Sequence, residues 1–228
     1  MINPSRHLSV FSPNDFGNTR IDVIGAGATG SKVVVQLAKL GIQNIHVWDF
    51  DKVEAHNIAN QAFAIGHIGK PKVEALYDVV KASTGTKIDP HNERVDGSQQ
   101  FGEVVFLLTD TMSSRKEIWE KGIRLKLGIK LMIETRMGTD NGRVYAINPR
   151  SLPHIHGWES TLTEDKKAVA SACGASVTVG PTADVLSGMA VWQFIRWDRQ
   201  SKGKDDLGDP ENEVVFALSP FNMFSRNF

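Results

Sequence analysis

This sequence contains very little cysteine and carries no net charge. Its 228 residues include one cysteine, Cys173, so neither an internal disulfide nor a zinc ribbon can form, and a disulfide-stapled secreted scaffold is excluded. The 26 Lys and Arg residues balance 26 Asp and Glu residues, whereas proteins that bind nucleic acids or membrane surfaces usually carry a basic excess. We therefore expect neither nucleic acid nor membrane among its partners.

Long apolar runs are scarce as well. Residues 1–15 contain no apolar core of signal-peptide length. The least charged stretch, 168–195, contains Pro181 and Asp184, whereas a membrane-spanning helix needs about 20 predominantly apolar residues. The sequence therefore predicts a soluble, cytoplasmic protein.

Short β-rich runs alternate with helical periodicity from Arg20 onwards. Between 21 and 48, strand, helix and strand follow one another at the spacing of a βαβ unit, which implies parallel strands. The Asp-Asn-Gly turn at 140–142 predicts an antiparallel pairing further along the chain. We expect an α/β fold with a Rossmann-like doubly wound sheet, mostly parallel, with some antiparallel strands toward the C-terminus.

The expected elements define one domain, 20–228, preceded by an N-terminal arm, 1–19. The periodicity is lost from 148 to 174, and a segment of this length inside a compact domain is usually functional or mobile. The aromatic tail, 221–228, is expected to pack against the chain's own sheet, with docking on a partner as the alternative. Strands are expected at 21–24, 45–48, 88–95, 104–108, 130–134, 142–147 and 214–218, and helices at 28–40, 69–82, 113–125 and 181–197.

A glycine motif lies between the first expected strand and the helix that follows it. Gly25, Gly27 and Gly30 form the pattern G-x-G-x-x-G, with Ala28 inside it. The first glycine permits a tight turn, the second lets the backbone approach a phosphate, and the third allows close packing of helix and strand. Asp49 ends the second strand, where an acidic side chain accepts the ribose hydroxyls. The motif predicts nucleotide binding without deciding between NAD and ATP.

The polar residues after Asp49 favour nucleotidyl transfer. Adenylyl transfer needs an exposed α-phosphate, cations and polar side chains around the triphosphate, and a carboxylate that holds Mg²⁺. Asn57, Gln61 and Lys72 can supply hydrogen bonds and positive charge, and Asp110 can hold Mg²⁺. A dehydrogenase needs none of these groups at this spacing.

In this order of motifs the chain resembles the ThiF/MoeB/HesA group, bacterial relatives of the ubiquitin-activating enzymes. That family's pattern is a glycine loop, D-x-D after the second strand, N-L-x-R-Q, G-x-x-K, and a T-D motif with a nearby arginine. The corresponding stretches here are 25–30, 49–51, 57–61, 69–72 and 109–110, the last followed by Arg115. The resemblance extends into 173–195.

The resemblance implies that the chain binds ATP and Mg²⁺ and adenylates the C-terminal glycine carboxylate of a small ubiquitin-like or sulfur-carrier protein, releasing pyrophosphate. It also implies a homodimer. By the same resemblance, Asp49 holds the ribose, Asp110 is the Mg²⁺-linked catalytic carboxylate, and Arg115 orients its loop. The expected catalytic residues are Asp110, Lys72 and Arg115, and the expected ATP-binding residues are Gly25, Gly27, Ala28, Gly30, Asp49, Asp51, Asn57, Asn60, Gln61, Lys72 and Asp110.

Two departures from the family pattern matter. The arginine of N-L-x-R-Q falls on Asn60, which removes a cation from the triphosphate, a loss worth a few kcal/mol of transition-state stabilisation. Lys70, Arg136, or Arg6 from a second subunit are the candidates to replace it. The family's paired zinc cysteines are absent, so we expect no zinc site.

Cys173 and two neighbouring histidines are further candidates for chemistry. Some family members use a cysteine near this point to take the activated acyl group, as a thioester or a persulfide. Cys173 is either such an acceptor or a small buried residue beneath the last helix, and we expect adenylation to proceed without it. His154 and His156 form an H-x-H pair, for which we expect solvent-exposed loop histidines rather than a metal site.

Two other functions remain open at this stage. An NAD(P)-dependent oxidoreductase on the same fold explains the glycine motif and Asp49. It leaves four residues without a role: Asn57, Gln61, Lys72 and Asp110. A nucleotide-binding but inactive partner subunit is suggested by Asn60, whereas the intact Lys72 and Asp110 argue against it.

Overall fold

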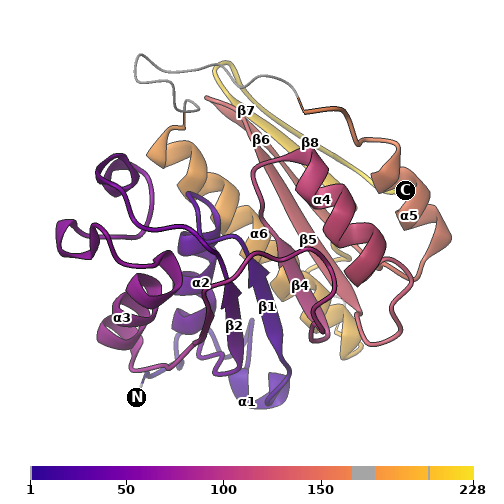
Figure 1. Ribbon diagram of the computed structural model, residues 1–228. Coiled ribbons are helices and arrows are strands. Elements are labelled where there is room, and N and C mark those ends of the chain that lie inside the picture. The colour runs from indigo at the N-terminus through magenta and orange to yellow at the C-terminus, as the bar shows by residue number, and fades with distance from the viewer. Residues whose placement is uncertain (1, 166–177, 205) are drawn as a thin grey trace.

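A mixed sheet runs through the computed structural model, which describes residues 2–165, 178–204 and 206–228 (Figure 1). Within those residues eight strands are hydrogen-bonded in the order β3-β2-β1-β4-β5-β6-β7-β8. The strands from β3 to β5 are parallel, and β6, β7 and β8 continue the sheet in antiparallel fashion. The predicted doubly wound α/β fold is therefore confirmed. The strands are β1 (Ile21–Ile24), β2 (Ile45–Trp48), β3 (Asp89–His91), β4 (Val104–Leu107), β5 (Leu131–Met137), β6 (Asn141–Ile147), β7 (Glu213–Leu218) and β8 (Phe221–Arg226).

The strand order reverses between β1 and β4. The chain runs from β1 outward to β2 and β3, and then returns to place β4 on the other side of β1. Residues 21–24 consequently pair in parallel with both 45–48 and 104–107. In open α/β sheets such a reversal leaves a crevice at the carboxyl ends of the two strands, and ligands bind there.

Helices cover both faces of the sheet. In Figure 1, α6 lies behind the strands and α4 lies in front of them. Among the described helices, none is long and apolar enough to cross a membrane. One face carries α1 (Pro13–Phe16), α2 (Gly30–Lys39), α3 (Lys72–Thr84) and α6 (Gly180–Ser201), and the other carries α4 (Met112–Ile118), the π-helical turn η3 (Trp119–Ile123) and α5 (Leu152–Glu159). The 3-10 turns η1 (Ala55–Ala59) and η2 (Ile65–His67) lie between β2 and α3.

The arrangement of helices on both faces of the sheet explains two sequence patterns, the apolar stripe of α2 and the continuous apolar run of β4. In α2, Val33, Val34 and Leu37 are fully buried, as expected of the apolar stripe of a helix that packs on one side. In β4 all four residues are buried, because helices cover both faces of a central parallel strand.

The segment from 148 to 174, which has no clean period in the sequence, contains α5. Pro153 lies in the first turn of this helix, where a proline is tolerated. Ile155 and Trp158 are fully buried against the sheet. Tertiary packing of these two side chains, rather than a long apolar stripe, defines the helix, so the expectation of an irregular segment is wrong for 152–159.

The ends of several elements also differ from expectation. β3 covers only three residues of the expected strand 88–95, whereas β5 continues three residues beyond the expected end at Glu134. The tail forms β8, which pairs with β7, so it joins the chain's own sheet as predicted. Phe221 and Phe224 stay exposed on it.

The N-terminal arm packs into the same core. Phe11 and Phe16 are buried, and their ring centroids lie 5.7 Å and 5.3 Å from that of Phe194 on α6. The guanidinium of Arg199 donates hydrogen bonds of 2.8 Å and 2.9 Å to the carbonyls of residues 9 and 10. The arm is therefore held against the C-terminal half of α6.

We predict that Phe11→Ala lowers the free energy of unfolding by about 3–5 kcal/mol, because it leaves a cavity beside Phe16 and Phe194. Urea unfolding followed by tryptophan fluorescence measures this change. Leu8→Ala, at a residue of the same arm that is 45% exposed, is the control and should cost less than about 1 kcal/mol. Equal effects of the two variants would show that the arm does not belong to the core.

Glu213 on β7 is a buried carboxylate that joins three strands of the antiparallel half. It accepts a 2.7 Å hydrogen bond from the Tyr145 hydroxyl and pairs with the guanidinium groups of Arg143 on β6 and Arg226 on β8. Burial acts to raise the pKa of Glu213, but Tyr145 and the two arginines outweigh it, so this pKa lies below its ordinary value.

The depressed pKa predicts how stability depends on pH. Unfolded Glu213 titrates near its ordinary pKa of about 4.3. Its stabilising contribution is therefore fully present above that pH and is lost as the pH falls through the lower pKa of the folded state. Between about pH 7 and pH 3, urea unfolding should show a smaller loss of stability for Glu213→Gln than for the wild type.

Glu103→Gln is the control for this pH experiment, because Glu103 forms an exposed ion pair with Lys130. This variant should keep the wild-type dependence of stability on pH. Parallel pH profiles for the wild type and Glu213→Gln would contradict the role given to Glu213.

Candidate functional site

The glycine turn between β1 and α2 is shaped by its contact with the end of β4. Gly25 has a φ of 99°, and a Cβ at this position would lie 2.6 Å from the carbonyl oxygen of Leu108. A Cβ on Gly30 would lie 1.9 Å from the Gly25 carbonyl oxygen, whereas one on Gly27 would meet no described atom within 4 Å. The turn can therefore form only with glycine at positions 25 and 30. The backbone at Gly27 is left open, as expected where a phosphate approaches.

Asp49 fixes the end of β2 to this turn. Its carboxylate accepts backbone N–H bonds from Ala26 at 2.7 Å and from Asp51 at 2.8 Å. Burial raises the pKa of Asp49, and the nearby Lys72 ammonium acts in the opposite direction. Each carboxylate oxygen has accepted one of these bonds, and a carboxylate has capacity for further donors such as the hydroxyls of a ribose.

Lys72 brings a positive charge to this edge of the sheet. It is the first residue of α3, its side chain is 9% exposed, and its Nζ lies 2.8 Å from the Asp51 carboxylate. Its backbone N–H donates to the Asp51 carbonyl at 2.8 Å, so main chain and side chain both hold the pair. Asp51 is half exposed, so an incoming anion such as a phosphate can compete with it for the ammonium group.

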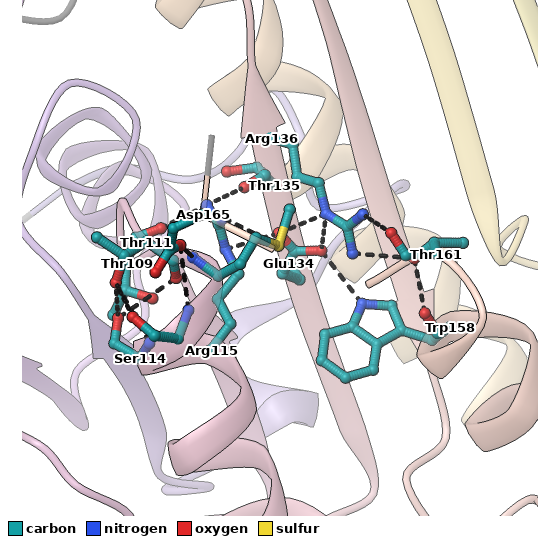
Figure 2. Close-up of polar contacts among 12 residues, drawn as sticks. Thr109, Thr111, Ser114, Arg115, Glu134, Thr135, Arg136, Trp158, Thr161 and Asp165 are labelled. Atoms are coloured by element: carbon teal, nitrogen blue, oxygen red, sulfur yellow. Dashed lines mark hydrogen bonds and ion pairs between the residues drawn. The ribbon is translucent and has the colours of Figure 1, made fainter. Parts of the chain in front are cut away.

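The loop that follows β4 is oriented by a buried arginine (Figure 2). The guanidinium of Arg115 on α4 donates hydrogen bonds to the carbonyls of Thr109 and Thr135, and its Nε lies 3.0 Å from the fully buried carboxylate of Glu134. Asp110, the residue after Thr109, is exposed. Arg115 therefore holds the loop that carries Asp110, which is a positioning role.

The buried carboxylate of Glu134 contacts two arginines and an indole (Figure 2). Besides Arg115, it pairs with Arg136 at 3.0 Å and accepts a 3.1 Å hydrogen bond from the indole N–H of Trp158. Arg136 also donates to the carbonyl and hydroxyl oxygens of Thr161 at 2.8 Å and 2.9 Å. The charge of Arg136 is thus held inside the protein by Glu134.

Asp165 caps the N-terminal end of α4. Its carboxylate accepts the backbone N–H groups of Met112 at 2.5 Å and Ser113 at 3.3 Å. The Thr111 hydroxyl accepts the N–H of Ser114 at 3.2 Å and satisfies another donor of the same helix end. The chain that leads toward residue 166 consequently touches the loop of the candidate site.

The segment 57–62 lies against the first turn of α2. The side-chain oxygen of Asn57, which is buried, accepts the N–H of Glu54 at 2.9 Å. The N–H of Ala62, at the end of this segment, donates to the hydroxyl of Ser31 at 3.0 Å. Asn57 therefore shapes the turn η1 with its oxygen, and its amide nitrogen is the part that can face a ligand.

Three buried side-chain oxygens around this site have no hydrogen-bond partner among the described residues. They are Oδ1 of Asn60, Oε1 of Gln61 and Oγ1 of Thr109. The Asn60 amide nitrogen donates to the hydroxyl of Thr178, just before α6. Buried polar atoms without partners are costly, and they mark places where water or a ligand completes the bonding.

Most of the site residues expected from the sequence are thus linked by direct contacts. A continuous run of contacts leads from Lys72 through Asp51 and Asp49 to the glycine turn, and from Gly25 to the end of β4. Ala28 lies half-buried within the glycine turn. The side chains come from loops at the carboxyl ends of β1, β2 and β4, where the reversal of strand order predicts a ligand.

Other expected residues are engaged elsewhere. Lys70 pairs with Asp78 at 3.2 Å, and Arg136 is held in the interior. Neither candidate replaces the cation missing at Asn60 in this arrangement. Cys173, the candidate acyl acceptor, lies outside the described residues.

The H-x-H pair lies on α5 rather than in a loop, which corrects that expectation. The Nδ1 of His154 accepts the N–H of Asn148 at 3.0 Å, and burial lowers the pKa of His154. His156 is exposed. Residues two apart on a helix do not face each other, so the two rings are not placed to share a metal ion.

The fold and these contacts define a doubly wound α/β protein with a glycine turn where the strand order reverses, and comparison with known proteins gives its family. A model of the ThiF family matches residues 8–222, so the chain belongs to the ThiF family. It is 36% identical over 105 residues to the NEDD8-activating enzyme E1 catalytic subunit of Arabidopsis thaliana, a match that covers 43% of this chain and 23% of that protein. It is 34% identical over 88 residues to the adenylyltransferase and sulfurtransferase UBA4 of Yarrowia lipolytica, covering 38% and 22% of the two proteins.

Solved structures share the fold. A crystal structure of MccB from E. coli superposes with a TM-score of 0.76 at 14% identity, covering 97% of this chain and 67% of the other. PaaA superposes with a TM-score of 0.72 at 16% identity, covering 98% and 68%. At these identities the likeness concerns the fold alone, and the sequence matches span about a quarter of the length of the curated relatives.

Sequence reasoning missed Glu134, Ser31 and Asp165. A signal exists for Glu134, because it follows the apolar run 131–133 in a strand expected to be buried, and a buried carboxylate requires a cation. Ser31 and Asp165 carry no comparable signal. Their contacts join segments that are distant in sequence, so the fold must be known before their roles can be assigned.

Alanine substitutions in the glycine turn are expected to differ sharply. Gly30→Ala should lower the free energy of unfolding by about 3 kcal/mol or more, because its Cβ would collide with the Gly25 carbonyl. Gly27→Ala should change it by less than about 1 kcal/mol, because the new methyl group meets open space. Urea unfolding without ligand measures both, and similar losses at the two positions would contradict the geometry of the turn.

Proposed function

We propose that this chain is an ATP-dependent adenylyltransferase that activates the C-terminal glycine carboxylate of a small ubiquitin-like or sulfur-carrier protein. The observation that carries the proposal is the run of contacts from Lys72 through Asp51 and Asp49 to the glycine turn, next to the loop of Asp110. Membership of the ThiF family supports the class of reaction. One solved structure of the similar fold is MccB with ATP.

The site offers what ATP requires at three points. The open backbone at Gly27 and the N-terminal end of the ten-residue helix α2 suit the phosphates. Asp49 can accept the ribose hydroxyls. The amide groups of Asn60 and Gln61 have unpartnered oxygens, and an amide can turn its N–H₂ toward a phosphate oxygen. Asn57 adds an amide nitrogen on the same segment.

Asp110 is the proposed ligand of Mg²⁺. It is an exposed carboxylate, and Mg²⁺ is usually held by one or two carboxylates together with the phosphates of a substrate. When bound, Mg²⁺ supplies neutralisation of the triphosphate charge and fixes the geometry of the phosphates. Arg115 and Glu134 keep the Asp110 loop in place from the interior.

The proposed reaction is an in-line displacement at the α-phosphorus. A carboxylate oxygen of the carrier forms a bond to this phosphorus, and the bond to the oxygen that bridges to the β-phosphate breaks. Pyrophosphate leaves with the electron pair, and because the carboxylate attacks as an anion, no proton has to move. The chain contributes positioning and electrostatic stabilisation, with Lys72 placed to balance charge on the phosphates.

The carrier class is inferred from the relatives. One is named a NEDD8-activating enzyme subunit and another an adenylyltransferase and sulfurtransferase. We infer a small carrier protein whose flexible C-terminal tail reaches the crevice between β1 and β4. A second copy of this chain, in a homodimer, is the candidate source of Arg6, which is exposed on the arm.

The two alternatives are weaker. An NAD(P)-dependent oxidoreductase leaves the nearly buried Lys72 and its pairing with Asp51 without a function. An inactive partner subunit would need neither Lys72 nor Asp110, whereas this chain retains both. The missing cation at Asn60 is the one feature that favours it.

We predict that Mg-ATP raises the melting temperature more than AMP, NAD or NADP at equal concentration. A ligand at a hundredfold excess over its Kd stabilises the folded state by about 2.7 kcal/mol. Lys72→Ala should lose most of this stabilisation. Lys81→Ala, on the exposed side of the same helix, should keep it. A shift with NAD or NADP alone would overturn the proposal.

Pyrophosphate exchange tests the chemistry. ATP–pyrophosphate exchange, measured with a panel of small ubiquitin-fold proteins that end in Gly-Gly, should require both Mg²⁺ and a carrier. Lys72→Ala and Asp110→Asn should each lower the exchange rate by about 100-fold or more, while Lys81→Ala leaves it unchanged. Binding of Mg-ATP without exchange on any carrier would instead identify an inactive partner subunit.

A further inference from the structure

Three metal-ligating side chains converge where β2 and β3 pair, apart from the nucleotide turn. The parallel register places His46 opposite Asp89 and Trp48 opposite His91. The Nδ1 of His46 lies 2.9 Å from the Nε2 of His91 and 3.2 Å from Oδ2 of Asp89, and the last two atoms are 3.8 Å apart. Asp89 and His91 are two residues apart in β3 and so share one face, and the register places His46 beside them.

The spacing of the three donor atoms fits a zinc ion. Ligands that lie about 2.0–2.1 Å from a tetrahedral zinc are about 3.3 Å from one another. The three observed separations, 2.9, 3.2 and 3.8 Å, are centred on that value. Two imidazoles and one carboxylate, with a fourth position for water, are a donor set that zinc uses and that Mg²⁺ or Ca²⁺ does not favour.

A second layer of contacts sets the protonation of His46. The Asn44 amide nitrogen donates to the Asn18 carbonyl at 2.9 Å, which turns the Asn44 Oδ1 toward the Nε2 of His46 at 3.2 Å. This oxygen accepts only, so it favours the tautomer with the proton on Nε2, which leaves Nδ1 available to bind an ion together with Asp89 and His91. Without a metal, the N–H of His91 fills that position, and a bound ion would replace this proton.

The His91 ring is also oriented, and the cluster is accessible. The ring stacks on the indole of Trp48 with centroids 3.7 Å apart and planes inclined by 9°. The side chains of His46, His91 and Asp89 are 17%, 26% and 56% exposed, so an ion can enter from solvent.

We propose that His46, Asp89 and His91 bind one Zn²⁺ ion that fastens the edge strand β3 to β2. This site does not depend on the proposed adenylation. The expectation of no zinc site rested on the absence of paired cysteines, and it did not consider donors that lie more than forty residues apart in sequence. The proposal revises that expectation with a different set of ligands.

Zinc titration of the full chain tests the site. The protein is stripped with a chelator, dialysed, and titrated with ZnCl₂ in competition with a chromophoric zinc indicator. We expect one ion per chain and a rise in melting temperature on binding, because a ligand that binds only the folded state stabilises it. Co²⁺ in place of zinc should give the intense visible bands of a four-coordinate site. Weak, six-coordinate cobalt bands would overturn the proposed geometry.

Variants separate this site from adventitious binding. His46→Gln and Asp89→Asn should each weaken zinc binding at least about tenfold. The control is His56→Gln, which removes a histidine from an exposed pair whose Nδ1 lies 3.5 Å from Glu54. Circular dichroism and the melting temperature of the stripped variants establish that they remain folded. Absence of zinc binding by the wild type, or an equal loss in His56→Gln, would overturn the proposal and leave the cluster as a hydrogen-bonded group only.

Discussion

The close approach of Gly25 to the Leu108 carbonyl is the constraint on which the candidate site depends. The two segments meet because β1 and β4 are neighbours across the reversal of strand order. There is no room for a Cβ between them, so the chain leaves β1 in a turn that only glycine adopts without strain, and α2 begins directly afterwards. Since β1, β2 and β4 are parallel, their following loops reach the same edge. Asp49 then ties the second loop to the first by accepting the backbone N–H of Ala26.

The distribution of positive charge is the main departure from the family pattern. Two arginines lie near the loop after β4, yet Glu134 holds both in the interior, and their hydrogen bonds go to Thr109, Thr135 and Thr161. Removing one member of such a group would leave a buried charge without compensation, so these charges serve the architecture of the site. Under the proposed function, the cationic environment of the triphosphate would come from Lys72, the backbone at the start of α2, and Mg²⁺.

The sequence could predict the elements that show a pattern within a short stretch of neighbouring residues. The glycine motif, the apolar stripe of α2 and the continuous apolar run of β4 each follow from burial on one or two faces, and the structure places them as expected. It could not predict α5, because a short helix held by Ile155 and Trp158 has too few buried positions to show a period. Glu134 and the His46 cluster escaped for a different reason. The partners of Glu134 lie on α4, on α5 and on its own strand, so helix packing brings them together. The partners of His46 lie on β3, so the sheet register brings them together.

The edge strand β3 connects the two sites physically. It has only three residues and no neighbour beyond β2 among the described strands, so few backbone hydrogen bonds hold it. One of those bonds runs from the N–H of Asp49 to the carbonyl of His91 at 3.2 Å. A metal ion on the His91 imidazole would therefore restrain the residue that supports the backbone of the proposed ribose carboxylate. Because that carboxylate in turn accepts the N–H of Ala26, such a restraint reaches the glycine turn through two hydrogen bonds, and it requires no movement of the sheet.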